Sequence, residues 1–224
     1  MTDLTVIFLT ANNHPKHWTE YHKNILLKAI GKHDLITVSR KPLDFGHNII
    51  DRGPKSHINM YYQLMEAAKI AKTPFVAVAE DDVLYHENHF NFFRPPLDTF
   101  AYNMNRWSLY SWVPDLYSMK QRKSNCTLIA PRELLIEAWT ERFAKHPIEN
   151  YPIRLVSEVG RANMDGWLGV TVRKSVEVYD SVGVIHINHP NGTDSTGMKK
   201  RLGEVRAYDI PYWGKACELI KEYR

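Results

Sequence analysis

Residues 75–83 combine an apolar run with three consecutive acids, Glu80, Asp81 and Asp82. An apolar run of this length is typical of a central strand in a parallel sheet. Open α/β sheets bind their ligands at the loops that follow the carboxyl ends of such strands. Three adjacent carboxylates repel one another, so a binding site there needs a cation, and hard oxygen ligands favour Mg²⁺ or Mn²⁺. The alternative is an exposed acidic turn that closes the strand.

The composition is that of a globular protein. The chain has 224 residues, of which 44% are hydrophobic and 24% charged, and this favours one domain. No apolar stretch is long enough to span a membrane, and the N-terminus lacks the pattern of a signal peptide. Cys126 and Cys217 have apolar neighbours, which predicts core thiols and a reducing, cytoplasmic location. The net charge of +4 suits a phosphate-bearing partner.

The first half of the chain alternates strands and helices. Gly and Pro residues mark the breaks between periodic segments, and Ser56 is in position to cap a helix. The predicted order is strand 4–9, helix 15–31, strand 34–39, loop 43–55, helix 56–68 and strand 75–83. This order predicts an α/β fold with a mostly parallel sheet flanked by helices.

The second half is more mixed. We predict strands at 107–113 and 125–129, a helix at 131–143, a long β-rich segment at 176–187, a turn-rich loop at 188–203 and a terminal helix at 213–223. No repeat or linker separates these segments, so one compact domain is expected.

Two histidines, His186 and His189, lie at the end of the β-rich segment. Strand alternation would point them to opposite faces, so both can reach one metal ion only if the strand ends near Asn188. We therefore expect one histidine, rather than two, to join the carboxylates. The alternative is a structural role for both.

Two further segments have the residue types of a reactive site. Residues 192–201 combine glycines and hydroxyls with Lys199 and Arg201, a composition that suits phosphate oxygens, although the spacing is not that of a Walker loop. Glu158 and Asp165 lie in a segment that contains several small residues and ends at Trp167. Either acid could act as a general base in a cleft. A surface loop and structural acids are the alternatives.

Taken together, these features resemble the nucleotide-sugar glycosyltransferases of the GT-A fold. Glu80-Asp81-Asp82 resembles their Asp-x-Asp metal motif, with Glu in place of Asp at the first position, and an acidic pair followed by an aliphatic residue, as in Asp81-Asp82-Val83, is common in that motif. Gly53 and Asn59 match a Gly-x5-Asn pattern in which the Asn opens the helix before the metal strand, although His57-Ile58 replaces the usual Ala-Arg. The resemblance covers roughly residues 4–190.

The resemblance implies a single GT-A-like, Rossmann-like domain with a nucleotide-sugar half at about 1–100 and an acceptor half at about 101–224. It implies Mn²⁺ or Mg²⁺ as the cofactor, with Asp82 as the most direct ligand. Residues implied at the metal are Asp82, Glu80, and His186 or His189. Residues implied at the nucleotide sugar, for which UDP is favoured, are Thr10, Ala11, Asn12, Arg40, Lys55, Asn59, Glu80, Asp81, Lys199 and Arg201. Asp165 is the implied base, with Glu158 as a second candidate, and a base favours inversion at the sugar carbon.

The acceptor is less constrained. One class is a bacterial surface glycan or lipid-linked sugar, and the other is a hydroxylated base in DNA, such as phage DNA. The absence of a membrane-binding amphipathic helix favours DNA slightly, and aromatic and basic side chains between residues 102 and 123 could line a groove for it. Alternatives from other classes are a nucleotidyltransferase, a metal-dependent hydrolase and a non-catalytic DNA-binding module.

Overall fold

The computed structural model describes residues 2–119, 122–189, 204–206 and 209–224. The helices are α1 (Lys16–Ile30), α2 (His57–Ile70), α3 (Arg132–Lys145), α4 (Ala162–Leu168) and α5 (Ala216–Tyr223). The strands are β1 (Leu4–Thr10), β2 (Asp34–Ser39), β3 (His47–Ile50), β4 (Phe75–Glu80), β5 (Val83–Leu84), β6 (Thr99–Asn103), β7 (Arg106–Tyr110), β8 (Val113–Met119), β9 (Leu128–Pro131), β10 (Lys174–Val178), β11 (Val184–Asn188) and β12 (Glu204–Arg206).

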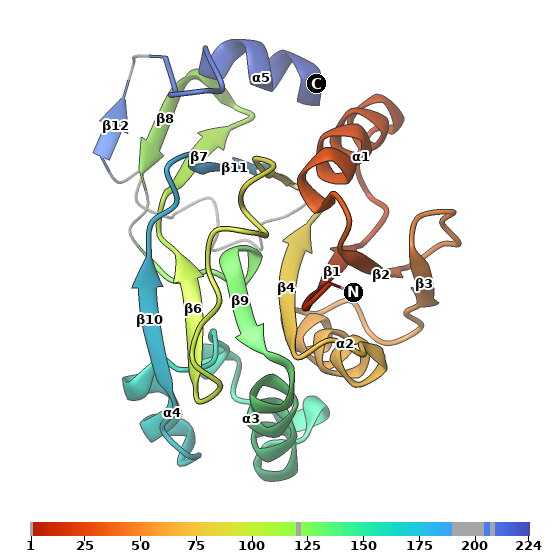
Figure 1. The fold of residues 1–224 in the computed structure, drawn as a ribbon, viewed down its shortest axis with the longest axis vertical. Helices are drawn as coiled ribbons and strands as arrows, with labels where there is room; N and C mark the ends of the chain where they lie inside the picture. The colour runs from red at the N-terminus through yellow and green to blue at the C-terminus, as the bar shows by residue number, and fades with distance from the viewer. Residues whose placement is uncertain (1, 120–121, 190–203, 207–208) are drawn as a thin grey trace.

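The strands form two sheets. The larger, as described, has seven strands in the order β10-β6-β9-β4-β1-β2-β3, and the smaller has five in the order β12-β8-β7-β11-β5. In the larger sheet only β9 runs antiparallel to its neighbours. The predicted fold class, an α/β protein with a mostly parallel sheet flanked by helices, is therefore confirmed (Figure 1).

Helices cover both faces of the larger sheet. On one face α2 and α3 pack together, with the rings of Tyr61 and Trp139 stacked 4.3 Å apart. On the other face Leu26 and Ala29 of α1 pack on residues of β1 and β4 that point the opposite way. The apolar run in β4 is buried from both sides, as its uninterrupted hydrophobicity predicts.

Several predicted elements differ from the structure. The predicted loop 43–55 contains β3, a short edge strand, and the second half contains β6, which was not predicted. The β-rich segment 176–187 is broken into β10 and β11, which belong to different sheets. Such breaks depend on which strand each segment pairs with, and this is not a local property of the sequence. No helix in the described ranges has the length and apolar character needed to cross a membrane.

Candidate active site

The three acids lie at the point where the chain leaves the larger sheet. β4 ends at Glu80, and β5 begins the path into the smaller sheet at Val83. Two side chains of α1 hold the backbone of this acidic turn. Trp18 Nε1 donates to the carbonyl of Asp81 at 2.8 Å, and His22 Nε2 lies 3.1 and 2.9 Å from the carbonyls of Glu80 and Val83. Because both its partners are acceptors, His22 Nε2 carries the proton.

Asp81 is held by residues that follow β1. Thr10 Oγ1 donates to Asp81 Oδ2 at 2.5 Å, and His14 Nε2 lies 3.1 Å from Asp81 Oδ1. Burial alone would lower the pKa of His14, but the hydrogen bond and the charge of Asp81, together with the charge of Asp82, raise it. Asp81 therefore has a partner on each of its two carboxylate oxygens.

Asp82 faces two histidines and has one oxygen unused. His186 Nε2 lies 3.2 Å and His189 Nε2 3.7 Å from Asp82 Oδ2. Burial opposes ionisation, but the two histidines lower the pKa of Asp82 below its usual range. Asp82 Oδ1 is buried and has no hydrogen-bond partner among the described residues.

Both histidines lie beside Asp82, although only one was expected to join the carboxylates. β11 ends at Asn188, so His189 lies beyond the strand and is released from the alternation that directs His186. The condition under which both histidines can approach one carboxylate is met.

Glu80 differs from its two neighbours. Asn125 Nδ2 donates to Glu80 Oε1 at 3.1 Å. Burial, and the nearby charge of Asp82, raise the pKa of Glu80 to about 8. In the metal-free protein Glu80 therefore holds a proton near neutral pH.

The predicted nucleotide-binding residues after β1 and β2 form one network. Asn12 has a positive φ of 53°, and its Oδ1 accepts from the backbone nitrogens of Arg40 and Lys41 at 2.7 and 2.9 Å. Arg40 Nε lies 3.3 Å from Asp51 Oδ2, which also accepts from Asn59 Nδ2 at 2.9 Å. The side chain of Asn12 thus joins the loop after β1 to the loop after β2.

The Gly-x5-Asn pattern has a steric basis. A Cβ added to Gly53 would lie 2.6 Å from Asn59 Oδ1. Asn59 opens α2, and its backbone nitrogen donates to the capping Ser56 side chain at 3.1 Å, as predicted. Gly53 is therefore needed for close packing, since its backbone has no positive φ.

Four of the residues predicted to bind the nucleotide sugar remain to be located. Ala11 and Lys55 are exposed. Lys199 and Arg201 lie outside the described residues.

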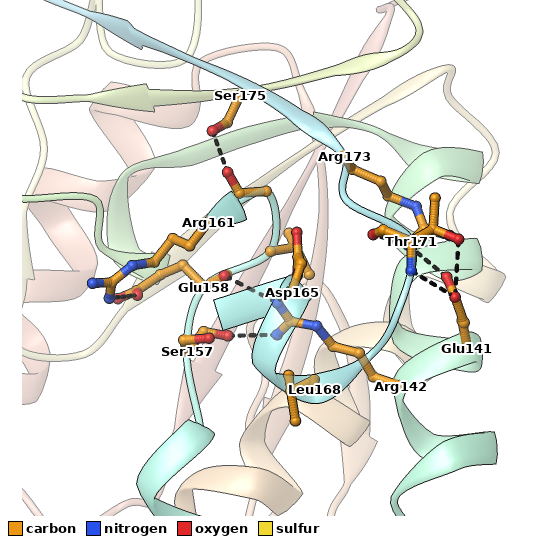
Figure 2. Close-up of polar contacts among 12 residues, drawn as sticks. Glu141, Arg142, Ser157, Glu158, Arg161, Asp165, Leu168, Thr171, Arg173 and Ser175 are labelled. Carbon is orange, nitrogen blue, oxygen red and sulfur yellow. Dashed lines mark hydrogen bonds and ion pairs between the residues drawn. The ribbon is translucent and has the colours of Figure 1, made fainter. Parts of the chain in front are cut away.

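Asp165, one of the two predicted bases, lies apart from the acidic turn. Figure 1 shows α4, which carries Asp165, beside the tail of β10, whereas β4 points toward the other end of the molecule. Asp165 lies within α4, and Arg142 Nη2 donates to its Oδ1 at 2.5 Å. Glu158 accepts from Arg161 at 3.0 Å and stays 16% exposed, against 3% for Asp165 (Figure 2).

A second observation concerns Glu158. Burial raises the pKa of Tyr61 well above its usual value, with further contributions from the charges of Glu158 and then Glu80. Tyr61 therefore lies within electrostatic reach of both Glu158 and Glu80.

Several residues that surround the acidic turn could not be identified as site residues from the sequence. Tyr223 of α5 packs its ring 5.7 Å from His14 and 5.5 Å from His189. Arg106 of β7 is 1% exposed and lies 2.8 Å from His186 Nδ1. Both come from segments far away in sequence, and no local motif identifies them.

A cavity of about 130 Å³ opens beside Asp81, between α1 and the segment that follows β2. Its walls include the rings of Phe8 and Phe45, and its polar end includes Thr10 and Asn12. By contrast, the groove expected between residues 102 and 123 loses two members, because Tyr102 and Arg106 are buried.

The fit of a cation can be judged from these donors. No group of three or more His, Cys, Asp or Glu side chains in the described residues is arranged to hold a metal ion. The unpartnered Oδ1 of Asp82 is nevertheless a buried oxygen donor that needs a positive partner. Mg²⁺ is usually bound by one or two carboxylates together with substrate phosphates and water, not by a complete protein cage. The residues fit a cation that arrives with a phosphate ligand.

Comparisons with known proteins give a distant likeness. No protein-family model and no curated protein sequence matches the chain. Among solved structures it is similar to a glycosyltransferase involved in glycosylation of the major capsid of PBCV-1, with 10% identity, a TM-score of 0.48, and coverage of 86% of this chain and 95% of that chain. It is also similar to 2-C-methyl-D-erythritol 4-phosphate cytidylyltransferase from Thermus thermophilus, with 14% identity, a TM-score of 0.48, and coverage of 85% and 95%.

A third similar structure is a mannosyltransferase from Pyrobaculum calidifontis in complex with GDP-Man and Mn²⁺, with 11% identity, a TM-score of 0.45 and coverage of 83% of this chain. The present chain spans 56% of that protein, so about half of its length. These matches include both glycosyltransferases and nucleotidyltransferases. At such low identities and TM-scores they describe the fold at most, and the function must be argued from the site.

Proposed function

We propose that this protein transfers a sugar from a nucleotide sugar to an acceptor hydroxyl, with a divalent cation at Asp82. The observation that carries the proposal is the buried, charged Asp82 at the carboxyl end of β4, with its Oδ1 lacking a hydrogen-bond partner in the described residues. A buried ionised oxygen without a partner is costly, and a cation is the partner that removes this cost.

The residues around Asp82 would have different roles in binding the cation and the donor. Asp82 and His189 would hold the cation, which supplies positive charge opposite the phosphates of the leaving nucleoside diphosphate. Asp81, fixed by Thr10 and His14, stays available as an acceptor for a ribose hydroxyl or a metal-bound water. Glu80 keeps its proton and positions Asn125, so it does not compete for the cation.

The cavity beside Asp81 offers room for part of the nucleotide. Aromatic walls suit a planar base, and Thr10 and Asn12 bring polar atoms to the end nearest the acids. The link from Asn12 to Arg40 holds the opposite loop in place. UDP remains the predicted nucleotide, and Lys55 a predicted diphosphate contact.

Glu158 is the better-supported of the two predicted bases. Its carboxylate is partly exposed, whereas that of Asp165 is enclosed beside Arg142. A base must reach the acceptor hydroxyl directly or through one water. Deprotonation of that hydroxyl by Glu158 would give direct displacement with inversion.

The acceptor class remains a prediction. Burial of Tyr102 and Arg106 removes two side chains from the groove expected for DNA, while Trp112 stays 37% exposed. Hydroxylated DNA and glycan or lipid-linked acceptors are both to be offered to the enzyme once a donor is identified.

The decisive experiment measures the thermal midpoint with nucleoside diphosphates, nucleotide sugars and nucleoside triphosphates, each with and without Mn²⁺. A ligand present at 100 times its Kd stabilises the folded state by about 2.7 kcal/mol. We expect a Mn²⁺-dependent rise with one family of nucleotide sugars, and its loss in Asp82→Asn. The matched control is Asp34→Asn, an exposed acid at the start of β2.

The outcomes separate the alternatives. A shift only with a nucleoside triphosphate, accompanied by pyrophosphate release, would point to nucleotidyl transfer instead. Hydrolysis of every donor without an acceptor would favour the hydrolase. No shift with any nucleotide would contradict the proposal and leave the binding module.

A further inference from the structure

The inference concerns Arg106 and its hydrogen bond to His186. β7 and β11 are parallel neighbours in the smaller sheet, with Arg106 opposite Val184 and Ser108 opposite His186. Side chains two residues apart share a face, so Arg106 and His186 are diagonal neighbours. β11 also pairs with β5, where His186 lies opposite Val83. The register thus places Arg106 beside His186, and Asp82, which directly precedes β5, lies next to them, since its carbonyl accepts from the backbone nitrogen of Ile187 at 2.8 Å.

The chemistry of these three side chains sets the direction of their hydrogen bonds. Arg106 NH1 lies 2.8 Å from His186 Nδ1. A guanidinium has only donors and keeps its charge at all accessible pH values, so Nδ1 must accept. The ring proton then lies on Nε2, which is 3.2 Å from Asp82 Oδ2 and donates to it.

Arg106 is a costly residue for a purely structural position. Its side chain is 1% exposed, and its Nε and NH2 have no hydrogen-bond partner in the described part of the chain. A buried guanidinium with unused donors lowers stability relative to an apolar side chain of similar size. A role in the candidate site would explain why an arginine occupies this buried position.

We propose that Arg106 is a positioning residue that fixes the tautomer of His186, so that His186 donates to Asp82 and does not ligate the cation. The inference rests on the proposed function for its cation, and it names the histidine that binds. With a proton on Nε2, His186 orients Asp82 through its contact with Oδ2, and His189 remains the candidate histidine ligand of the cation. A partner of this kind changes metal affinity about 10- to 100-fold when it is lost.

The test is the protonation pattern of the His186 ring, measured by long-range ¹H–¹⁵N correlation in imidazole-labelled protein. His186→Gln assigns the signal. In the metal-free wild type we expect a proton on Nε2 and a bare Nδ1. The same pattern should persist after addition of Mg²⁺ and a nucleoside diphosphate. Arg106→Met should lose the bare Nδ1, and Arg106→Lys, which retains a donor, should restore it.

Binding of Mn²⁺ supplies the second readout. We expect Arg106→Met to weaken Mn²⁺ about 10- to 100-fold and Arg106→Lys to recover most of the loss. A wild-type ring with its proton on Nδ1, or a bare Nε2 after metal addition, would overturn the inference. The wild-type spectrum decides even if Arg106→Met fails to fold. Because the metal-free spectrum needs no nucleotide, its result is independent of whether the proposed function fails.

Discussion

Arg142 NH2 donates to Asp165 Oδ1 at 2.5 Å inside the protein, where the two side chains are 1% and 3% exposed. Arg142 also donates to the carbonyls of Ser157 and Glu158 (Figure 2). The pair therefore ties α3 and α4 to the segment that presents Glu158. This geometry assigns Asp165 a task in stability, whatever its contribution to the reaction.

Asp165→Asn should lower the free energy of unfolding by about 3 kcal/mol, because it leaves the Arg142 cation buried without its counter-charge. Denaturant unfolding measures the loss. The double variant Arg142→Met/Asp165→Leu removes both charges and should recover most of it. A stability of Asp165→Asn equal to that of wild type would show that the pair is not enclosed as described.

Glu158→Gln should reduce kcat by about 100-fold or more while the thermal midpoint stays close to that of wild type, because a general base contributes a factor of this size and Glu158 is only partly buried. Asp165→Asn should retain turnover per folded molecule. Initial rates with the donor and acceptor identified for the wild type test both expectations. The reverse ranking would return the role of base to Asp165.

Gly53→Ala should destabilise the protein by about 1 to 3 kcal/mol, because the new methyl group would overlap Asn59 Oδ1 and disturb its hydrogen bond to Asp51. Gly166→Ala is the matched control. Gly166 lies in α4, and an added Cβ there meets no atom within 4 Å. Thermal unfolding of the two variants should separate them clearly, and equal midpoints would contradict the steric explanation.

His89 should make stability depend on pH. Burial lowers its pKa to about 4 from the usual 6.5. Between pH 4 and pH 6.5 the unfolded chain binds a proton at this histidine, whereas the folded protein does not. The free energy of unfolding is therefore unaffected by His89 above pH 6.5, and it decreases as the pH falls toward 4. The total loss is about 3 kcal/mol. His89→Gln should flatten this part of the stability curve relative to wild type, and exposed His17→Gln should not.

The two cysteines should differ in reactivity. Burial raises the pKa of Cys126 to about 12, so its thiolate is scarce, whereas Cys217 in α5 is only half-buried. A thiol reagent at pH 8 should label Cys217 in the native protein and both residues after denaturation. The variants Cys126→Ser and Cys217→Ser identify the labelled site. Rapid native labelling of Cys126 would show that its surroundings open.

The predictable part of the fold has strong local signals. The uninterrupted apolar run of β4, the Ser56 cap of α2 and the Gly31 end of α1 are all where the pattern places them. β6 and the break between β10 and β11 could not be predicted in the same way, because strand pairing across the sheet determines them.

The candidate site, like the fold, could be predicted only in part from the sequence. The three acids and the two histidines could be found because the members of each group lie within four residues of one another in the sequence. Arg106, Tyr223 and Asn125 contact them only through tertiary structure. Asp165 has the composition of a catalytic acid, but the burial of Arg142 beside it is not visible from residue types.

The turn between β4 and β5 is also the passage from one sheet to the other. Asp81 and Asp82 are fastened on one side to Thr10 of the larger sheet and on the other to His186 of the smaller sheet. The two carboxylates therefore join the edges of the two sheets through their side chains as well as through the chain itself, so a ligand that contacts both carboxylates also bridges the two sheets.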